Sequence, residues 1–290
     1  MLDIYKNIGN SLQALESSLR ISISNADNFD TPGFKYTFAS FTTLYNDVES
    51  SGSETTNPIQ LGASMTLGST STDFSQGNIG FGTGLDVAIS GEGFFLVSQS
   101  AREFSAGSSQ VFTRAGRFNL DFQGKYLVDS FDRKVYGFPL SEDGTVTSDI
   151  PEAIDISEHD DVGFLDGGIL VNNYQARKDQ IASGLGEDDL VEQIPLYRIA
   201  LTSFKNKNGL VLTDGSAYKA TAASGESFDA GISGEGVLGN VKSESLESSN
   251  ISVAKVALDM NQLNRGFSAV QGIIDDVSKV IGQLIQKLTA

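Results

Sequence analysis

The chain has 290 residues, of which 39% are hydrophobic and 20% charged, and these proportions are typical of a folded globular protein. Its formal net charge of −17 repels phosphate backbones and anionic membrane surfaces, which argues against a nucleic-acid partner. Because cysteine is absent, disulfides, thiolate nucleophiles and cysteine-based metal sites are excluded. The stretch 36–249 carries the whole net charge of −17, so the two ends are close to neutral. Near-neutral ends favour burial or contact with a partner.

The first predicted element is an amphipathic helix at the N-terminus. The opening residues, MLDIYKNIGNSLQALESS, lack the basic region and continuous apolar run of an ordinary cleaved secretory signal. No run of 18 or more apolar residues follows anywhere in the chain, so the sequence predicts no membrane-spanning helix. The helical stripe repeats at spacings of three and four and consists of Tyr5, Ile8, Leu12, Leu15 and Leu19.

The stretch NADNFDTPGFK, residues 25–35, ends this helix. Asn25 and Asp27 can end or recap a helix, because their side chains bond to nearby backbone groups. Pro32 lacks an amide hydrogen and forces the preceding residue toward extended geometry. Gly33 permits a sharp turn, and Phe34, Tyr36 and Phe38 then alternate, which predicts one buried face.

The middle of the chain predicts short strands joined by turns. Residues 46–58, NDVESSGSETTNP, have the polar composition of a surface loop. The stretch 84–100 alternates apolar and small residues on either side of a turn at 91–93. Strands are also predicted within 111–140, with turns near 122–124 and 132–133, and within 194–204 and 209–223. Residues 158–190 are acidic and punctuated by glycine, and no element is assigned to them.

The C-terminal end carries the most regular pattern, a heptad-type seam without proline that predicts a long helix. Two helices with matching stripes at opposite ends of one chain pack most simply on each other as a coiled coil. Gly266, Gly272 and Gly282 each cost up to about 1 kcal/mol in a helix interior, which indicates close approach of neighbouring helices. The seam consists of Val253, Val256, Met260, Leu263, Phe267, Val270, Ile274, Val277, Ile281, Leu284 and Leu288.

No pattern in the sequence favours an enzyme, a cofactor or a small-molecule substrate. The single histidine, His159, lies within SEHDD, and no second histidine supports a metal site or a catalytic triad. Residues 234–239 match G-x-G-x-x-G, but no βαβ unit surrounds them and a glutamate in the turn would oppose a phosphate. We therefore expect no catalytic, cofactor-binding or metal-binding residues.

Four collinear stretches resemble a known family. TPGFK at 31–35 follows an N-terminal amphipathic helix and an asparagine-containing turn. It is followed by FSQGNI with GLDVAISGEGFFLV at 74–97, then by FTRAGRFNLDFQGKYLV at 112–128, and last by LESSNISVAKVALDMNQLNRGFSA at 246–269. In this order they resemble the signature segments of bacterial flagellar rod and hook proteins, most closely those of a distal-rod-type subunit. Residues 140–220 carry little of the resemblance.

The resemblance implies an α+β fold in which the terminal helices pair as an inner coiled-coil domain and a mainly-β domain lies outside. The expected divisions are 1–30 with 250–290 as the inner domain, 31–80 with 220–249 as an extended connecting region, and 81–219 as the outer domain.

It also implies a structural role in the axial tube of the flagellum. The subunit would polymerise helically with copies of itself and with other rod and hook proteins, transmit torque and enclose the export channel. Export through the flagellar type III apparatus would place it in the basal body or the exterior hook. The assembly interface would comprise the N-terminal helical stripe and the part of the C-terminal seam that runs from Val256 to Leu288. It would also include the junction residues Asn25, Pro32, Gly33 and Phe34.

Departures from the family pattern leave the subtype open between rod and hook. Asp27, Phe29 and Asp30 replace small or apolar residues, and Asn264 stands where glutamine is commoner. The short body and the polar loop before the QG motif favour a rod subunit, whereas TGLDVAISGEGFF is equally typical of a hook. Two alternatives outside the family are a secreted adhesin with a coiled-coil stalk and a hydrolase that uses His159.

Overall fold

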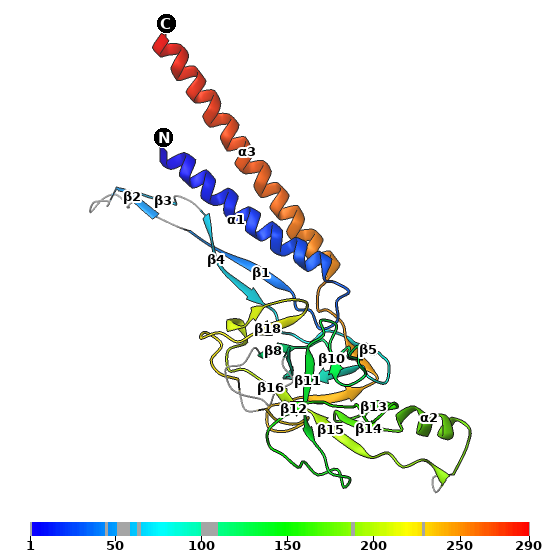
Figure 1. The fold of residues 1–290 in the computed structure, drawn as a ribbon. Coiled ribbons are helices and arrows are strands. Elements are labelled where there is room, and N and C mark those ends of the chain that lie inside the picture. Colours follow the sequence, from blue (N-terminus) through cyan, green and yellow to red (C-terminus); the bar gives the residue numbers. More distant parts are fainter. Residues whose placement is uncertain are drawn as a thin grey trace. The chain divides into compact units, whose positions relative to one another are not determined.

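The computed structural model describes residues 2–43, 46–50, 59–62, 65–99, 110–186, 189–227 and 230–289. The fold is α+β, with a helix at each end of the chain and strands between them (Figure 1). It divides into two compact units, each described separately below. The helical unit contains 1–29, 36–73 and 251–290, and the β unit contains 30–35 and 74–250.

The helical unit consists of two long helices and two strand pairs. Both predicted helices are confirmed: α1 spans Leu2–Asp27 and α3 spans Val253–Thr289. Pro32 and Gly33 follow the end of α1, as their backbone preferences require. The strands are β1 (Thr37–Thr43), β2 (Asn46–Ser50), β3 (Ile59–Gly62) and β4 (Met65–Thr72).

β1 pairs with β4 and β2 pairs with β3, both in antiparallel register. The prediction of a loop across 46–58 is therefore wrong at 46–50, which forms β2. Backbone pairing with β3 stabilises this polar segment, and composition does not report such pairing. Residues 51–58, the rest of the predicted loop, lie outside the described part of the chain.

The β unit is built on one antiparallel sheet, which runs in the order β13-β14-β15-β11-β7-β8-β18-β17 with β9, β10, β12 and β16 attached beside this path. Two further pairs, β19 with β6 and β20 with β5, complete the unit. The strands predicted within 84–100, 111–140, 194–204 and 209–223 are confirmed. The bounds are β5 (Ile79–Phe81), β6 (Val87–Ser90), β7 (Phe94–Ser98), β8 (Gln110–Thr113), β9 (Asn119–Leu120), β10 (Leu127–Val128), β11 (Lys134–Pro139), β12 (Glu152–Ala153), β13 (Val162–Leu165), β14 (Ile169–Asn172), β15 (Pro195–Ile199), β16 (Leu201–Thr202), β17 (Val211–Leu212), β18 (Ala217–Lys219), β19 (Asn240–Ser243) and β20 (Ser245–Glu247).

The stretch 158–190, unassigned from sequence, contains β13, β14 and a short helix, α2 (Tyr174–Ala182). A single turn of 3₁₀ helix, η2 (Lys207–Gly209), precedes β17.

Strand β7 lies at the centre of the β unit and is buried along its whole length. Because successive side chains point to opposite faces, Phe95 and Val97 pack into one core, whereas Phe94 and Leu96 pack into another. In the second core Phe94 meets Phe204 edge-on, with ring centroids 6.0 Å apart. The sheet is therefore covered on both faces, and the β unit has a substantial core of its own.

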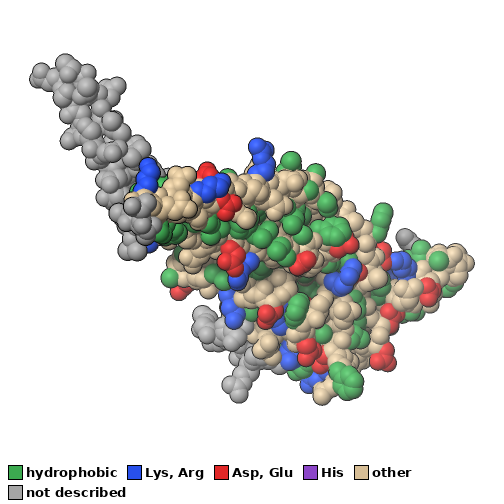
Figure 2. All heavy atoms as spheres, turned by 90° about the horizontal axis from the view of Figure 1, so that it is seen from above, with side chains coloured by type: hydrophobic (Ala, Val, Ile, Leu, Met, Phe, Trp, Pro, Cys, Tyr) green, Lys and Arg blue, Asp and Glu red, His purple; other side chains and the backbone are tan. Residues whose placement is uncertain are grey.

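The surface of the described residues is mixed in chemistry. Figure 2 shows one face, on which basic and acidic side chains are interspersed and hydrophobic side chains lie between them. None of the described helices combines the length and apolarity that crossing a membrane requires.

Candidate functional site

The junction after α1 is held in the helical unit by the side chain of Asn25. Its Nδ2 donates to the carbonyl oxygen of Thr37 at 2.6 Å, and its Oδ1 accepts from the amide of Thr37 at 3.0 Å. The side-chain amide of Asn25 thus forms hydrogen bonds with both backbone groups of Thr37, the first residue of β1. The expected capping role is wrong for Asn25. Instead, Asn28 bonds back to the carbonyl of Ser24 at 2.8 Å.

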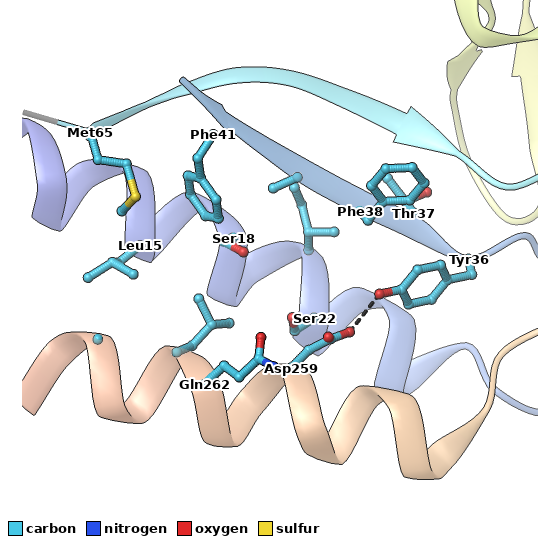
Figure 3. Close-up of a pocket in the computed structure, with 14 residues that line it drawn as sticks. Leu15, Ser18, Ser22, Tyr36, Thr37, Phe38, Phe41, Met65, Asp259 and Gln262 are labelled. Atoms are coloured by element: carbon cyan, nitrogen blue, oxygen red, sulfur yellow. Dashed lines mark hydrogen bonds between the residues drawn. The ribbon is translucent and has the colours of Figure 1, made fainter. Parts of the chain in front are cut away.

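Tyr36 connects the start of β1 with α3 inside the same unit. Its hydroxyl donates to Oδ2 of Asp259 at 2.6 Å (Figure 3). Nζ of Lys255 lies 3.8 Å from the ring centroid of Tyr36. Burial is the main cause that raises the pKa of Tyr36, and the hydrogen bond and negative charge of Asp259 raise it further. The tyrosine therefore stays neutral as a donor.

A hollow of about 360 Å³ lies between α1, α3 and the β1–β4 pair. In Figure 3, Leu15 comes from α1, and Phe41 and Met65 come from the two strands above the helices. Phe38, predicted to be buried, is 43% exposed, because its side chain lines this open hollow rather than a closed core. Both apolar and polar side chains line the hollow. It is lined by Leu15, Ser18, Ile21, Ser22, Tyr36, Thr37, Phe38, Ala39, Phe41, Met65, Asp259, Gln262, Leu263 and Gly266.

The predicted helical stripes are buried unevenly. In α1, Leu15 is buried, Tyr5 is exposed, and Ile8, Leu12 and Leu19 are half-buried. The other buried α1 side chains between Ala14 and Asn25 are small or polar, and a search for large apolar residues misses them. They are Ala14, Ser18, Ser22 and Asn25.

In α3 burial is greatest near the start of the helix. Val256 and Leu263 are buried, and Gly266 lies so close to Leu15 that an added Cβ would be 3.1 Å from that side chain. Val253 and Leu284 are exposed, and the side chain of Leu288 lies outside the described residues. The remaining seam residues, all half-buried, are Met260, Phe267, Val270, Ile274, Val277 and Ile281.

The β unit contains a fully buried group of charged residues. Nζ of Lys35 lies 2.5 Å from Oε1 of Glu247, and Nε of Arg114 lies 3.0 Å from Oε2 of the same carboxylate. The side chains of Lys35 and Glu247 are 0% exposed. One carboxylate thus balances two cations away from water, so each remaining donor needs an acceptor.

Backbone groups supply these acceptors. Lys35 also donates to the carbonyl of Ser75 at 2.8 Å, and Arg114 donates from one terminal nitrogen to the carbonyls of Gly91 and Gly93 at 2.8 and 2.7 Å. The amide of Gly77 donates to Glu247 at 2.9 Å. All four collinear sequence stretches contribute an atom to this group. This buried charged group was not predicted from the sequence. The signal that could have indicated it is the presence of a lysine, an arginine and a glutamate within the motifs themselves.

Gly33 lets the first of these stretches approach closely. Its φ is +68°, and an added Cβ would lie 2.4 Å from the backbone of Arg114 and Ala115. Its amide donates to the carbonyl of Glu247 at 2.8 Å. Phe34 is buried, and the half-buried Pro32 accepts a hydrogen bond from Ser216 at 3.0 Å. The predicted junction residues therefore lie beside the buried charges.

Comparison with known proteins finds relatives among flagellar proteins. No protein-family model matches the chain. It is similar to the flagellar basal-body rod protein FlgG of Bacillus subtilis, with 24% identity over 97% of both chains. It is also similar to FlgG of Borreliella burgdorferi, with 28% identity over 89% of this chain and 88% of that protein.

The flagellar hook protein FlgE of Helicobacter pylori (strain ATCC 700392 / 26695) is 34% identical over 126 residues, 41% of this chain. The chain spans only 17% of the length of that hook protein. The nearly full-length matches are thus to rod proteins and the partial matches to hook proteins. These similarities support a relationship of the chain to flagellar rod and hook proteins, of the distal-rod type.

Proposed function

We propose that this chain is a structural subunit of the flagellar basal-body rod, which polymerises helically into the axial tube that transmits torque and encloses the export path. The observation that carries the proposal is the similarity to FlgG along 97% of both chains. The hook is the weaker alternative, because the chain spans 17% of the hook protein it resembles. Its partners would be further copies, the neighbouring rod and hook proteins, and the type III export apparatus of the flagellum.

The proposed arrangement has three regions. The inner domain would be 1–30 with 250–290, the connecting region 31–80 with 220–249, and the outer domain 81–219. In the rod the inner helices would form coiled-coil contacts, and the predicted stripe and junction residues would lie at the interface between copies. This placement rests on the family and on the exposed apolar side chains of α3.

Those side chains support polymerisation through α3. The helix has 37 residues and α1 has 26, so at about 1.5 Å per residue α3 is longer by about 16 Å. Ile273 and Val280 are 52% and 55% exposed and lie beside the seam, which widens the apolar face beyond that of a simple pair. An apolar face of this width is suited to packing against the helices of other copies.

A pair of matched substitutions tests this role. We expect Val280→Asp to prevent sedimentable polymers of the purified chain, because it places a charge within the apolar face. Gln283→Asp adds the same charge at an exposed polar position and should leave polymerisation intact. The thermal transition of the β unit should be equal in both variants. If the two variants polymerise equally well, α3 does not lie at the interface between copies.

Quantitative mass spectrometry of purified hook–basal bodies tests the assignment to the rod. A low copy number relative to the hook protein is the expected result. A copy number equal to that of the hook protein would assign the chain to the hook instead. Absence of the chain from the particle would refute the proposal.

A further inference from the structure

The turn between β9 and β10 presents a fully exposed phenylalanine. Phe122 has a relative exposure of 105% and lies at the apex of the turn Asp121–Gly124. The amide of Gly124 donates to the carbonyl of Asp121 at 3.0 Å, and the amide of Lys125 donates to the Asp121 carboxylate at 2.6 Å. The amide of Asp121 donates to Tyr126 at 2.9 Å. Three hydrogen bonds thus hold the turn in one shape, so docking of Phe122 would require little ordering.

A second turn in the same unit has the same geometry without the aromatic residue. The amide of Gly144 donates to the carbonyl of Ser141 at 2.8 Å, and its φ of +76° is close to the +67° of Gly124. The central residues of this second turn are Glu142 and Asp143. Turns of this kind accept polar residues at the apex. Turn geometry alone therefore does not require the phenylalanine.

The same hairpin carries a small hollow at its base. The hollow has a volume of about 90 Å³, several times the roughly 10–15 Å³ that one water molecule requires. Pro32 and Ala115 contribute apolar lining, and Phe131, which is 51% exposed, forms an aromatic wall. Phe131 stacks 5.0 Å from the guanidinium of Arg133, which is buried and paired with Asp129 at 2.6 Å. The walls are thus held in place before anything binds.

The charges around the hollow favour the turn Asp121–Gly124 of another copy as its occupant. Arg117 lines the hollow, is exposed, and has no ion-pair partner within the part of the chain that the structure describes. The turn that carries Phe122 brings with it the carboxylate of Asp121, whose Oδ1 accepts from the amide of Lys125 and whose Oδ2 has no hydrogen-bond partner among the described residues. In a chain of net charge −17, a hollow with an unpaired arginine is a suitable site for an acidic segment of another copy.

This turn cannot fill the hollow of its own copy. Phe122 and Arg117 are five positions apart along one arm of the hairpin, about 16 Å of extended chain at about 3.3 Å per residue. Hydrogen-bonded pairing of β9 with β10 keeps the hairpin extended. Only a second copy can bring the two together.

We propose that Phe122 of one copy docks in the hollow beside Phe131 of a second copy, with Asp121 facing Arg117. This contact rests on the proposed function and adds a site to it. A single contact of this kind between two copies is heterologous, whereas a reciprocal pair of such contacts would make a closed two-fold dimer. Heterologous contacts that do not close into a ring continue as helical filaments. Aromatic anchors in preformed pockets are also the usual centres of binding energy at protein interfaces.

The absence of cysteine from the chain allows a direct test. Gln123→Cys places a thiol beside Phe122, and Ser130→Cys places one at the hollow. Both positions are exposed. The two single-cysteine full-length variants are mixed under polymerising conditions and oxidised, and the mixed disulfide dimer is quantified by mass. We expect the dimer to form, and we expect Phe122→Ala in the Gln123→Cys chain to reduce its yield about tenfold or more. Asp143→Cys, in the matched acidic turn, replaces Gln123→Cys as the control and should give only background.

The outcomes separate this contact from the proposed function. If the chain polymerises but the Gln123→Cys and Asp143→Cys mixtures give equal yields, the contact is refuted and the structural role stands. An undiminished yield with Phe122→Ala also refutes the anchor. A chain that forms neither polymers nor the mixed dimer at any concentration overturns both.

Discussion

Nζ of Lys35 lies 2.5 Å from Oε1 of Glu247 inside the β unit, although 212 positions separate the two residues. The two segments are also joined by their backbones, since Gly33 donates to the carbonyl of Glu247 at 2.8 Å and Asn250 donates to that of Phe34 at 3.4 Å. The chain passes through the β unit at 30–35, re-enters it at 74 and leaves it after 250. The segments 30–35 and 247–250 are therefore bound to each other around one buried carboxylate.

Removing that carboxylate should destabilise the β unit strongly. Glu247→Gln leaves Lys35 and Arg114 buried without a counter-charge, and the loss of one partner from a buried pair typically costs about 3–5 kcal/mol. The free energy of urea unfolding measures the effect. Glu244→Gln makes the same change three positions away, in an exposed pair with Lys178, and should cost about 1 kcal/mol or less. Equal losses in the two variants would mean that the buried charges contribute no more than a surface pair.

Gly33 should tolerate a methyl group far less well than Gly124. Both have positive φ, +68° and +67°, so alanine incurs a similar backbone strain of about 1–2 kcal/mol at either position. At Gly124 the added Cβ meets nothing within 4 Å, but at Gly33 it would lie 2.4 Å from the backbone of Ala115. We expect Gly33→Ala to lower the melting temperature well beyond the shift caused by Gly124→Ala. Matching shifts would show that the close approach of the two segments is not required.

The hydrogen bonds of Asn25 should stabilise the helical unit. Asn25→Ala removes two hydrogen bonds to the backbone of Thr37, and one hydrogen bond typically contributes about 0.5–1.5 kcal/mol to stability. Hydrogen exchange should show faster exchange of the Thr37 amide in this variant. Gln13→Ala, an exposed change on the same helix, serves as the control. Unchanged protection of Thr37 in Asn25→Ala would contradict the proposed role of the bridge.

Stability should fall at high pH because of buried tyrosines. Burial, and then the negative charge of Glu152, raise the pKa of Tyr197 to about 12, above its ordinary value near 10. The folded state therefore holds this proton more tightly than the unfolded state. The resulting stability is fully present below about pH 10 and is lost as the pH rises through about 12.

Tyr197→Phe should reduce the slope of stability against pH in this window. Burial also raises the pKa values of Tyr36, Tyr174 and Tyr218, so part of the slope should remain. Unfolding at a series of pH values, in the parent chain and the variant, measures the difference. Parallel slopes would show that Tyr197 does not contribute.

Local patterns in the sequence determined the main elements of this protein. Spacings of three and four specify the two terminal helices, because only a helix places such residues on one face. Pro32 and Gly33 exclude helix beyond the junction through their own backbone limits, and the alternation of Val87 and Ile89 specified β6. Four motifs in order were sufficient to indicate the resemblance to flagellar rod and hook proteins.

Tertiary structure decided what those residues contact. Whether Lys35 is solvated or buried depends on a carboxylate 212 positions away, and no local property of either residue records that distance. The pairing of β2 with β3 and the exposure of Phe38 likewise depend on neighbours brought by the fold. Secondary structure follows from short-range sterics, whereas burial and ion pairing arise from long-range packing, which a single sequence leaves open.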